Sequence, residues 1–410
     1  MATHASILTV GVDVGSISIK IAAVAAGSAG GRLDPSALAA RGYRIVERES
    51  ARVALSPYER HLGRPRAVAV EMLRDLFRVL PEGGVDRLVV TGSGGKPLAA
   101  VLDTGTINEF RAVATGVRFL YPGAQTILEM GGENSKYIRL SPPSGEGIGI
   151  LDYETNGDCA AGTGSFMDQQ ATRLRYRIED VGAVTESAAR TPTIAGRCSV
   201  FAKSDMIHAQ QKGYAPGEVL RGLCEAVARN YKASITKGKK IEPPVAFIGG
   251  VSANAGVVRA MRSLFDLEEK DFIVPEEHVW MAALGAALLA PESSGAEGAR
   301  FRSPATVNAA DAGGEETFPR SEPLSMKNVV LLRHRVKPYV FPEDGRVVDA
   351  FLGIDIGSVS TNLVALDDDD KVIMEIYERT EARPIEIVHR GLQEIEKTIG
   401  RRIRIRGAGT

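Results

Sequence analysis

Short apolar runs alternate along this chain with longer stretches in which apolar residues recur at helical spacing. The pattern of Leu8–Ala25 predicts two paired strands. Pro65–Leu80 has the spacing of an amphipathic helix, and Arg87–Thr91 has the pattern of a strand. The same patterns predict these further elements up to residue 290: a helix around Thr106–Tyr121, a strand pair at Gln125–Leu140, helices at Ser165–Leu174 and Gly217–Lys237, a strand at Val245–Ile248, and helices at Ala255–Leu264 and Met281–Ala290. Because strands and helices alternate, we predict a layered α/β fold.

One motif occurs twice. Gly11–Lys20 returns as Gly353–Asn362, 353 − 11 = 342 residues later, with matching glycines, aspartate and serines. In both places an amphipathic helix, a strand and a Gly-x-Gly turn follow in the same order, which favours a duplicated domain over chance recurrence of a hairpin. The first copy takes 92 − 11 = 81 residues from motif to turn and the second 407 − 353 = 54, so about 27 extra residues are expected around Leu33–Pro65.

This repeat predicts the domain organisation. We expect residues 1–290 to form the first domain, 291–349 a linker, and 350–410 the start of a second copy. Pro291–Ser325 is rich in Gly, Ala, Ser, Pro and Glu, which is typical of a linker. The second copy stops at Thr410, inside an expected strand-to-helix turn. We therefore expect the 410 residues to be part of a longer protein with two tandem copies of one domain.

Composition excludes several classes of function. The formal net charge is −1, which gives no electrostatic reason to expect nucleic acid or an anionic membrane as partner. Three cysteines do not make a disulfide framework, and no signal peptide is recognisable. The longest apolar run, Val279–Ala290, is too short to span a bilayer. We therefore expect a cytoplasmic protein.

The repeated motif has the features of a phosphate-binding turn. Asp13, Gly15 and Ser16 lie at the tip of the first strand pair, where a glycine lets backbone N–H groups approach phosphate oxygens. Ser16, Ser18 and Lys20 add hydroxyl donors and a cation, and Asp13 would face a nucleotide's Mg²⁺ through water. An ordinary hairpin turn is the alternative for this motif alone.

Two further glycine turns strengthen the nucleotide hypothesis. Glu129 precedes Gly131 and Gly132 in a second strand pair, and a buried strand ends in a third turn that opens a helix, with Gly249, Gly250, Val251 and Asn254 as expected nucleotide contacts. Neither GxGxxG nor a Walker-type GxxxxGK[ST] is present. Three such turns in this order resemble the acetate and sugar kinase/Hsp70/actin superfamily. The resemblance implies two ribonuclease-H-like lobes that close over ATP, with Gly11–Lys20 and Glu129–Asn134 as phosphate loops and Gly249–Asn254 as the adenosine loop.

Two cysteines stand in glycine-rich or small-residue contexts, each before a helix-like run. Cys159 and Cys198 lie 198 − 159 = 39 residues apart, so they are not a local CxxC metal site. Two such segments meeting their copies across a two-fold axis would supply the four thiolates of a [4Fe–4S] cluster. Two buried free thiols are the alternative. Cys224 lies at helical spacing among apolar residues and is expected in the core.

The two cysteine contexts, Cys159-Ala-Ala-Gly-Thr-Gly164 and Cys198-Ser-Val-Phe-Ala-Lys-Ser-Asp205, are similar to those of one branch of the superfamily. That branch comprises the activators (archerases) of 2-hydroxyacyl-CoA dehydratases and benzoyl-CoA reductases, the BadF/BadG/BcrA/BcrD ATPase family, and the tandem copy resembles its long members. The resemblance implies a homodimer that shares one [4Fe–4S] cluster and hydrolyses ATP with Mg²⁺. It also implies ferredoxin or flavodoxin as electron donor and an iron–sulfur dehydratase, reductase or double-cubane protein as acceptor.

The resemblance assigns roles to residues of this chain. Asp13, Glu129 and Glu133 form the expected catalytic set. The glycine turns hold ATP or ADP, and Cys159 and Cys198 are the metal ligands. This sequence departs from simpler activators at Glu129, where they have aspartate, and at Glu133-Asn134, where they have Gln-Asp. A small-molecule kinase of the superfamily, or a non-redox Hsp70-like nucleotide switch, remains open as an alternative, and so does a cluster that bridges the two tandem copies.

Overall fold

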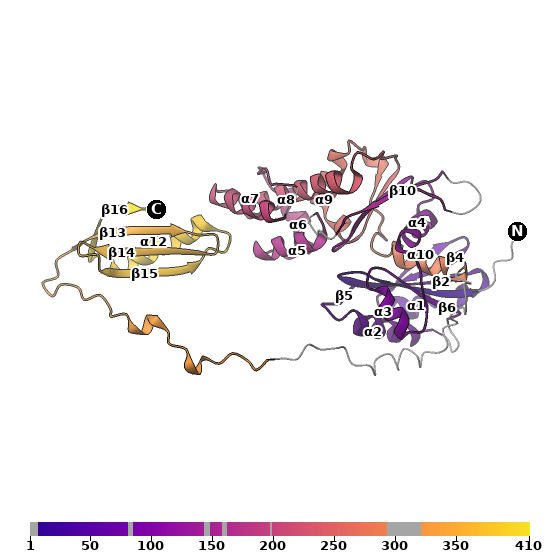
Figure 1. The fold of residues 1–410 in the computed structure, drawn as a ribbon, viewed down its shortest axis with the longest axis horizontal. Coiled ribbons are helices and arrows are strands. Elements are labelled where there is room, and N and C mark those ends of the chain that lie inside the picture. The colour runs from indigo at the N-terminus through magenta and orange to yellow at the C-terminus, as the bar shows by residue number, and fades with distance from the viewer. Residues whose placement is uncertain (1–6, 81–84, 143–147, 158–161, 197–198, 293–320) are drawn as a thin grey trace. The chain divides into compact units, whose positions relative to one another are not determined.

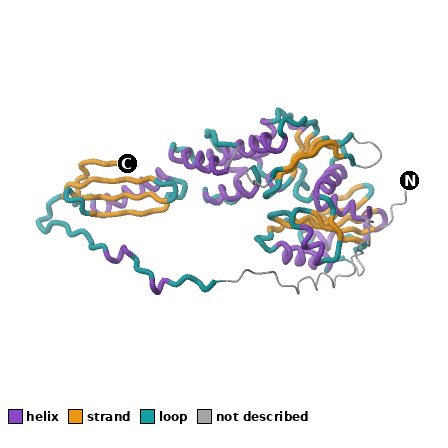
Figure 2. Tube along the Cα trace, viewed as in Figure 1, coloured by secondary structure: helices purple, strands orange, loops and turns teal. Residues whose placement is uncertain are grey.

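The computed structural model describes residues 7–80, 85–142, 148–157, 162–196, 199–292 and 321–410 (Figures 1 and 2). These residues divide into two compact units. The first comprises 1–168, 196–199 and 224–315, and the second 169–195, 200–223 and 316–410. The linker expected at Pro291–Ser325 lies mostly outside the described residues. None of the helices in the described ranges combines the length and apolar character that crossing a membrane requires.

The first sheet is built around the predicted strand pair. β1 (Ile7–Val14) pairs antiparallel with β2 (Ser18–Ala26) and parallel with β6 (Arg87–Thr91). The sheet continues through four short strands that the apolar pattern did not predict: β3 (Arg44–Arg48), β4 (Ala51–Leu55), β5 (Glu59–Arg60) and β7 (Gly105–Thr106). β1 and β2 are almost wholly buried, as strands with both faces covered are.

The side chains of β2 point alternately into two different hydrophobic cores. Ile21 and Ala23 face the core under α2 (Pro65–Phe77), whereas Ala22 and Val24 face the core that contains α4 (Glu109–Leu120). Two short helices complete the first layer: α1 (Pro35–Ala39) and α3 (Gly95–Val101).

The second sheet has the order β10-β9-β8-β11-β12. Its strands are β8 (Thr126–Met130), β9 (Ser135–Leu140), β10 (Ile150–Thr155), β11 (Val245–Ile248) and β12 (Phe272–Ile273). The helices nearest to it in sequence are α8 (Pro216–Tyr231), which runs on into a π-helical turn at Lys232–Thr236, and α9 (Ala255–Leu264). β11 and α9 have the predicted bounds, the β8–β9 pair begins one residue later than predicted, and α8 begins one residue earlier and ends six residues earlier. β10 and β12 were not predicted.

α4 and α10 (Met281–Leu289) pack between the two sheets, in one apolar core with residues from both (Figure 1). Their backbones touch at Gly116 and Gly285. A Cβ at Gly285 would overlap the carbonyl oxygen of Ala112, and one at Gly116 would overlap that of Met281. Glycine at both positions therefore lets the two helices approach as closely as this core requires.

The Gly285→Ala substitution is expected to destabilise the first unit by about 1–3 kcal/mol, because the added methyl group forces two helix backbones apart in a packed core. Urea unfolding measures this change. Gly123→Ala is the matched control, because no atom lies within 4 Å of a Cβ at Gly123. Equal unfolding midpoints for the two variants would contradict the described α4–α10 contact.

The second unit contains the later part of α5 (Gly164–Arg173), α6 (Val181–Glu186), α7 (Ser199–Gln211) and a C-terminal sheet. That sheet has the order β15-β14-β13-β16 and is covered by α12 (Pro384–Ile399). Its strands are β13 (Val348–Ile356), β14 (Ser360–Asp367), β15 (Val372–Arg379) and β16 (Ile403–Gly409). Short 3-10 turns lie at Gly27–Arg32, Ile178–Asp180, Gly250–Ala253, Glu269–Asp271, Ala290–Glu292, Met326–Asn328 and Leu332–Arg335.

The C-terminal sheet repeats the centre of the first sheet. β13 pairs antiparallel with β14 and parallel with β16, as β1 does with β2 and β6, and β15 occupies the place of β4. The extra residues of the first copy fall mainly between β2 and β4, where 50 − 26 = 24 residues stand against 371 − 367 = 4 between β14 and β15. The insertion thus begins earlier than the segment expected from the sequence.

Candidate functional site

The turn between β1 and β2 places two opposite charges side by side. Asp13 and Lys20 are cross-strand neighbours, and the Lys20 Nζ lies 2.6 Å from Asp13 Oδ2. Both side chains are buried. Gly15 closes the turn by donating its N–H to the Ser18 carbonyl oxygen at 3.0 Å. Lys20, expected to face phosphate oxygens, therefore lies next to the aspartate expected to face the metal ion.

The second carboxylate oxygen of Asp13 is buried and has no hydrogen-bond partner among the described residues. Burial raises the pKa of Asp13, and the nearby Lys20 only partly opposes this shift. Gly92, in the left-handed region at φ +91°, backs this oxygen so closely that a Cβ there would overlap it. An unpaired buried carboxylate oxygen is costly, so this atom is suited to a cation or its bound water.

A buried lysine bridges two acids in the second strand pair. The Lys136 Nζ on β9 lies 2.8 Å from Glu129 Oε2 on β8 and 2.9 Å from Glu109 Oε1 at the start of α4. Burial alone would lower the pKa of Lys136, but the two carboxylates outweigh it and raise that pKa. Burial raises the pKa of Glu129 despite the lysine. The first unit thus holds two ion-paired groups, Asp13 with Lys20 and Lys136 with Glu109 and Glu129, of which Glu109 is the most exposed at 24%.

The tips of the first two turns meet. A Cβ at Gly132 would overlap Ile17 and come within 3.1 Å of the Ser16 hydroxyl oxygen, so only glycine allows this approach. Gly131 donates its N–H to the Asn134 carbonyl oxygen at 2.8 Å. Glu133, one of the predicted catalytic acids, is exposed. The structure therefore brings Ser16 and Gly132 together and leaves the Glu133 side chain in solvent.

The third turn packs against the end of β8. Gly249 has φ +92°, and a Cβ there would come within 2.5 Å of the Met130 carbonyl oxygen. Asn254 caps α9, because its Oδ1 accepts the N–H groups of Gly256 and Val257 at 2.9 and 3.3 Å. Its Nδ2 is buried without a partner in the described structure. Val251 is buried and Gly250 is exposed.

Sequence reasoning missed four residues that support these turns: Glu109, Lys136, His61 and His278. His278 contacts the third turn, since its Nδ1 lies 2.8 Å from the Gly249 carbonyl oxygen. Burial lowers the pKa of its imidazole. His61 supports the first turn, with its Nε2 3.2 Å from the Gly15 carbonyl oxygen. An isolated histidine carries no spacing pattern, so the sequence alone could not have found either.

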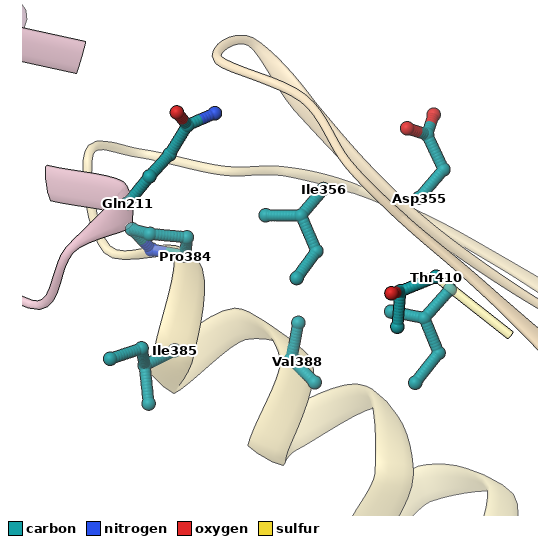
Figure 3. A pocket seen from close by; sticks show the side chains of 8 residues that line it. Gln211, Asp355, Ile356, Pro384, Ile385, Val388 and Thr410 are labelled. Carbon is teal, nitrogen blue, oxygen red and sulfur yellow. The ribbon is translucent and has the colours of Figure 1, made fainter. Parts of the chain in front are cut away.

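The second copy retains the turn but not its charge pair. Asp355 and Asn362 occupy the register of Asp13 and Lys20, and the Asn362 amide donates to Asp355 at 3.0 Å. Thr380 takes the place of His61, because its hydroxyl donates to the Gly357 carbonyl oxygen at 2.8 Å. A pocket of about 580 Å³ adjoins this turn (Figure 3). It is lined by Gln211, Ile354, Asp355, Ile356, Pro384, Ile385, Val388 and Thr410.

Both predicted metal ligands, Cys159 and Cys198, lie outside the described residues. Helices follow both in sequence: α5 begins at Gly164, five residues after the first cysteine, and α7 begins at Ser199, directly after the second. Val200 and Phe201, at the start of α7, are 66% and 67% exposed. Cys224 is buried on α8 as predicted, and burial raises the pKa of its thiol to about 12.

Comparison with known proteins places the chain in a family. Residues 10–290 match the model of the BadF/BadG/BcrA/BcrD ATPase family, and this chain belongs to that family. It is 35% identical over 188 residues to the activator of lactoyl-CoA dehydratase of Anaerotignum propionicum, covering 46% of this chain and 70% of the relative. It is 31% identical over 206 residues to the 2-hydroxyisocaproyl-CoA dehydratase activator of Clostridioides difficile, covering 50% and 74%.

A solved structure supports the same conclusion. Component A of the (R)-2-hydroxyglutaryl-CoA dehydratase of Acidaminococcus fermentans matches with a TM-score of 0.55 and 25% identity, over 69% of this chain and 97% of that one. The predicted α/β class and actin-like ATPase fold are thereby confirmed, and so is the family that the motifs resembled.

Proposed function

We propose that this chain is an ATP-hydrolysing iron–sulfur electron donor that reductively activates a partner metalloenzyme. The observation that carries the proposal is a nucleotide-type site with a buried, unpartnered Asp13 oxygen, in a chain that has one cysteine ahead of each of α5 and α7. The printed names of its relatives support it, since they are activators of lactoyl-CoA and 2-hydroxyisocaproyl-CoA dehydratases.

In this proposal the three turns bind ATP. Backbone N–H groups around Gly15, Gly131 and Gly132 would face the phosphates, and Gly249 and Gly250 the nucleoside. Asp13 and Glu129 would hold Mg²⁺ through its waters, and the free Asp13 oxygen fits that role. Bound Mg²⁺ supplies positive charge that stabilises the transferring phosphoryl group. Lys20 and Lys136 pair with Asp13 and Glu129, and their charges partly oppose the burial that raises the pKa of each acid.

Cys159 and Cys198 from two chains would supply the thiolates of one [4Fe–4S] cluster, which carries one electron when bound. The described neighbours fit such a group. The N-terminal ends of α5 and α7 favour nearby thiolates, and the exposed Val200 and Phe201 give α7 an apolar start suited to contact with a second chain. The electron would come from ferredoxin or flavodoxin in the cytoplasm and pass to an iron–sulfur dehydratase or reductase.

Cysteine variants test this assignment. Cys159→Ala and Cys198→Ala are each expected to lose most of the bound iron after anaerobic purification, because each removes two of the four ligands in a dimer. Cys224→Ala is the matched control and should keep its iron, since the Cys224 thiol is buried in the core with its pKa raised. A Cys159→Ala protein with its full iron content would refute the ligand assignment.

A further inference from the structure

The segment between β4 and α2 is held against the first turn at two points, Ser56 and His61. Ser56 donates its N–H to the Ile21 carbonyl oxygen at 2.9 Å, and its hydroxyl oxygen accepts the N–H of Ile21 at 3.0 Å. His61 donates its N–H to the Ile17 carbonyl oxygen at 3.0 Å. Ser56 and His61 are both buried. The residues between them are therefore fixed in position relative to the first phosphate turn.

Tyr58, which lies between these two points, reaches the third turn. A Cβ at Gly250 would lie 3.9 Å from the Tyr58 hydroxyl oxygen, which is an ordinary contact distance. Gly250 follows β11 of the second sheet, whereas the segment of Tyr58 is anchored to β2 of the first. Two residues after Tyr58, Arg60 forms an ion pair with Asp168 on α5. Tyr58 therefore extends from the phosphate turn of the first sheet to the expected nucleoside turn of the second.

The ring of Tyr58 is not part of a hydrophobic core. Tyr58 is 42% exposed, and it belongs to none of the apolar clusters within the described ranges. An aromatic ring presents flat faces on which other planar groups stack, and stacking of a nucleobase on such a ring strengthens binding whichever base it is. An exposed ring next to the expected nucleoside turn therefore provides a stacking surface for a base.

The third turn offers a polar group to the same ligand. Asn254 is only 8% exposed, and its Oδ1 is engaged by the N–H groups that begin α9. Its Nδ2 is buried and has no acceptor in the part of the chain that the structure describes. A buried donor without an acceptor costs free energy, which a ligand acceptor would recover. A nucleoside combines a planar base with hydroxyl and ring-nitrogen acceptors, so it suits both Tyr58 and Asn254.

We infer that Tyr58 binds the nucleoside part of the nucleotide, with its ring stacked on the base opposite the third turn. The inference rests on the proposed function and adds a residue of the first sheet to the nucleoside end of that site. The base is remote from the bond that hydrolysis breaks. Contacts with it therefore stabilise the ground state and the transition state equally, so Tyr58 contributes to nucleotide affinity rather than to the rate of the bound complex.

Two substitutions of Tyr58 test the inference in the whole chain, with calorimetry of Mg·ADP binding as the first measurement. In Tyr58→Ala the Kd for Mg·ADP is expected to rise about tenfold or more, because the stacking surface is lost. In Tyr58→Phe the Kd should stay within about twofold of the wild-type value, because the ring remains. Phosphate release is the second measurement, and in Tyr58→Ala it should show a raised KM for ATP with a much smaller change in kcat.

Two controls match these variants. Leu62→Ala removes a side chain that is 78% exposed just after the same segment. Tyr377→Ala removes a tyrosine that is 72% exposed in the second copy. Both should bind Mg·ADP as tightly as the wild type.

Three results would overturn the inference alone: an unchanged Kd in Tyr58→Ala, a Kd that rises as far in Tyr58→Phe as in Tyr58→Ala, or a kcat that falls in step with the affinity, which would give Tyr58 a structural role at the first turn. A wild type that does not bind Mg·ADP would refute the inference together with the proposed nucleotide site. The expected loss in Tyr58→Ala, found in a chain that never binds iron, would support the inference and refute only the redox proposal.

Discussion

The Asp13→Asn variant is expected to hydrolyse ATP about 10²–10³-fold more slowly than the wild type. Asp13 has one oxygen paired with Lys20 and another that is buried without a described partner, so it can present negative charge to a metal-bound water. An amide keeps the shape of the side chain and removes that charge. Phosphate release under saturating Mg·ATP measures the effect.

Asp355→Asn is the matched control for this measurement. Asp355 occupies the same register position in the second copy, and its side chain is exposed and bonded to Asn362 rather than to a lysine. Turnover in this control should equal that of the wild type. Full turnover in Asp13→Asn, with an unfolding midpoint like that of the wild type, would remove Asp13 from the catalytic set.

The Lys136→Met variant is expected to lose about 3–5 kcal/mol of stability, because it leaves Glu109 and Glu129 partly or fully buried without their shared cation. Urea unfolding at neutral pH measures the loss. Lys239→Met is the control. The Lys239–Asp152 pair is more exposed, so its removal should lower the free energy of unfolding by about 1 kcal/mol or less.

The loss in Lys136→Met should shrink as the pH falls. Burial raises the pKa of Glu129 even with the lysine present, and because the charge of Lys136 lowers that pKa, its removal raises the pKa further in the variant than in the wild type. A carboxyl group whose pKa is raised in the folded state binds its proton more tightly there, so the folded state gains relative stability as the pH is lowered through the raised pKa. A loss that is the same at neutral and acid pH would show that the buried charges are not its cause.

The elements of the nucleotide site could be predicted because each combines a local apolar pattern with a glycine turn. β1, β2, β8, β9 and β11 are short runs of buried residues bounded by such turns, and no long-range information is needed to recognise them. α3 and β10 were missed. α3 is a single short helix opened by Gly94 and Gly95, and β10 alternates half-buried and exposed residues at a sheet edge.

The charge network could not be predicted, because its members are far apart in the chain. Lys136 stands in a largely buried strand and meets Glu109 from 27 residues earlier, and only the packing of α4 against β9 brings them together. The contacts of α5 with the glycine turns are equally non-local: Gly164 meets Gly131, and Asp168 meets Arg60. The glycine turns in the sequence predict a nucleotide site. Only the folded structure shows how that site is connected to neighbouring segments.

Iron and acid-labile sulfide per chain, measured on anaerobically purified protein together with its oligomeric mass, test the central claim most directly. The account predicts about two irons and two sulfides per chain in a dimer, which corresponds to one [4Fe–4S] cluster held by Cys159 and Cys198 of both chains. A chain that binds Mg·ATP but stays iron-free after anaerobic reconstitution would contradict it and would favour a kinase or a non-redox nucleotide switch.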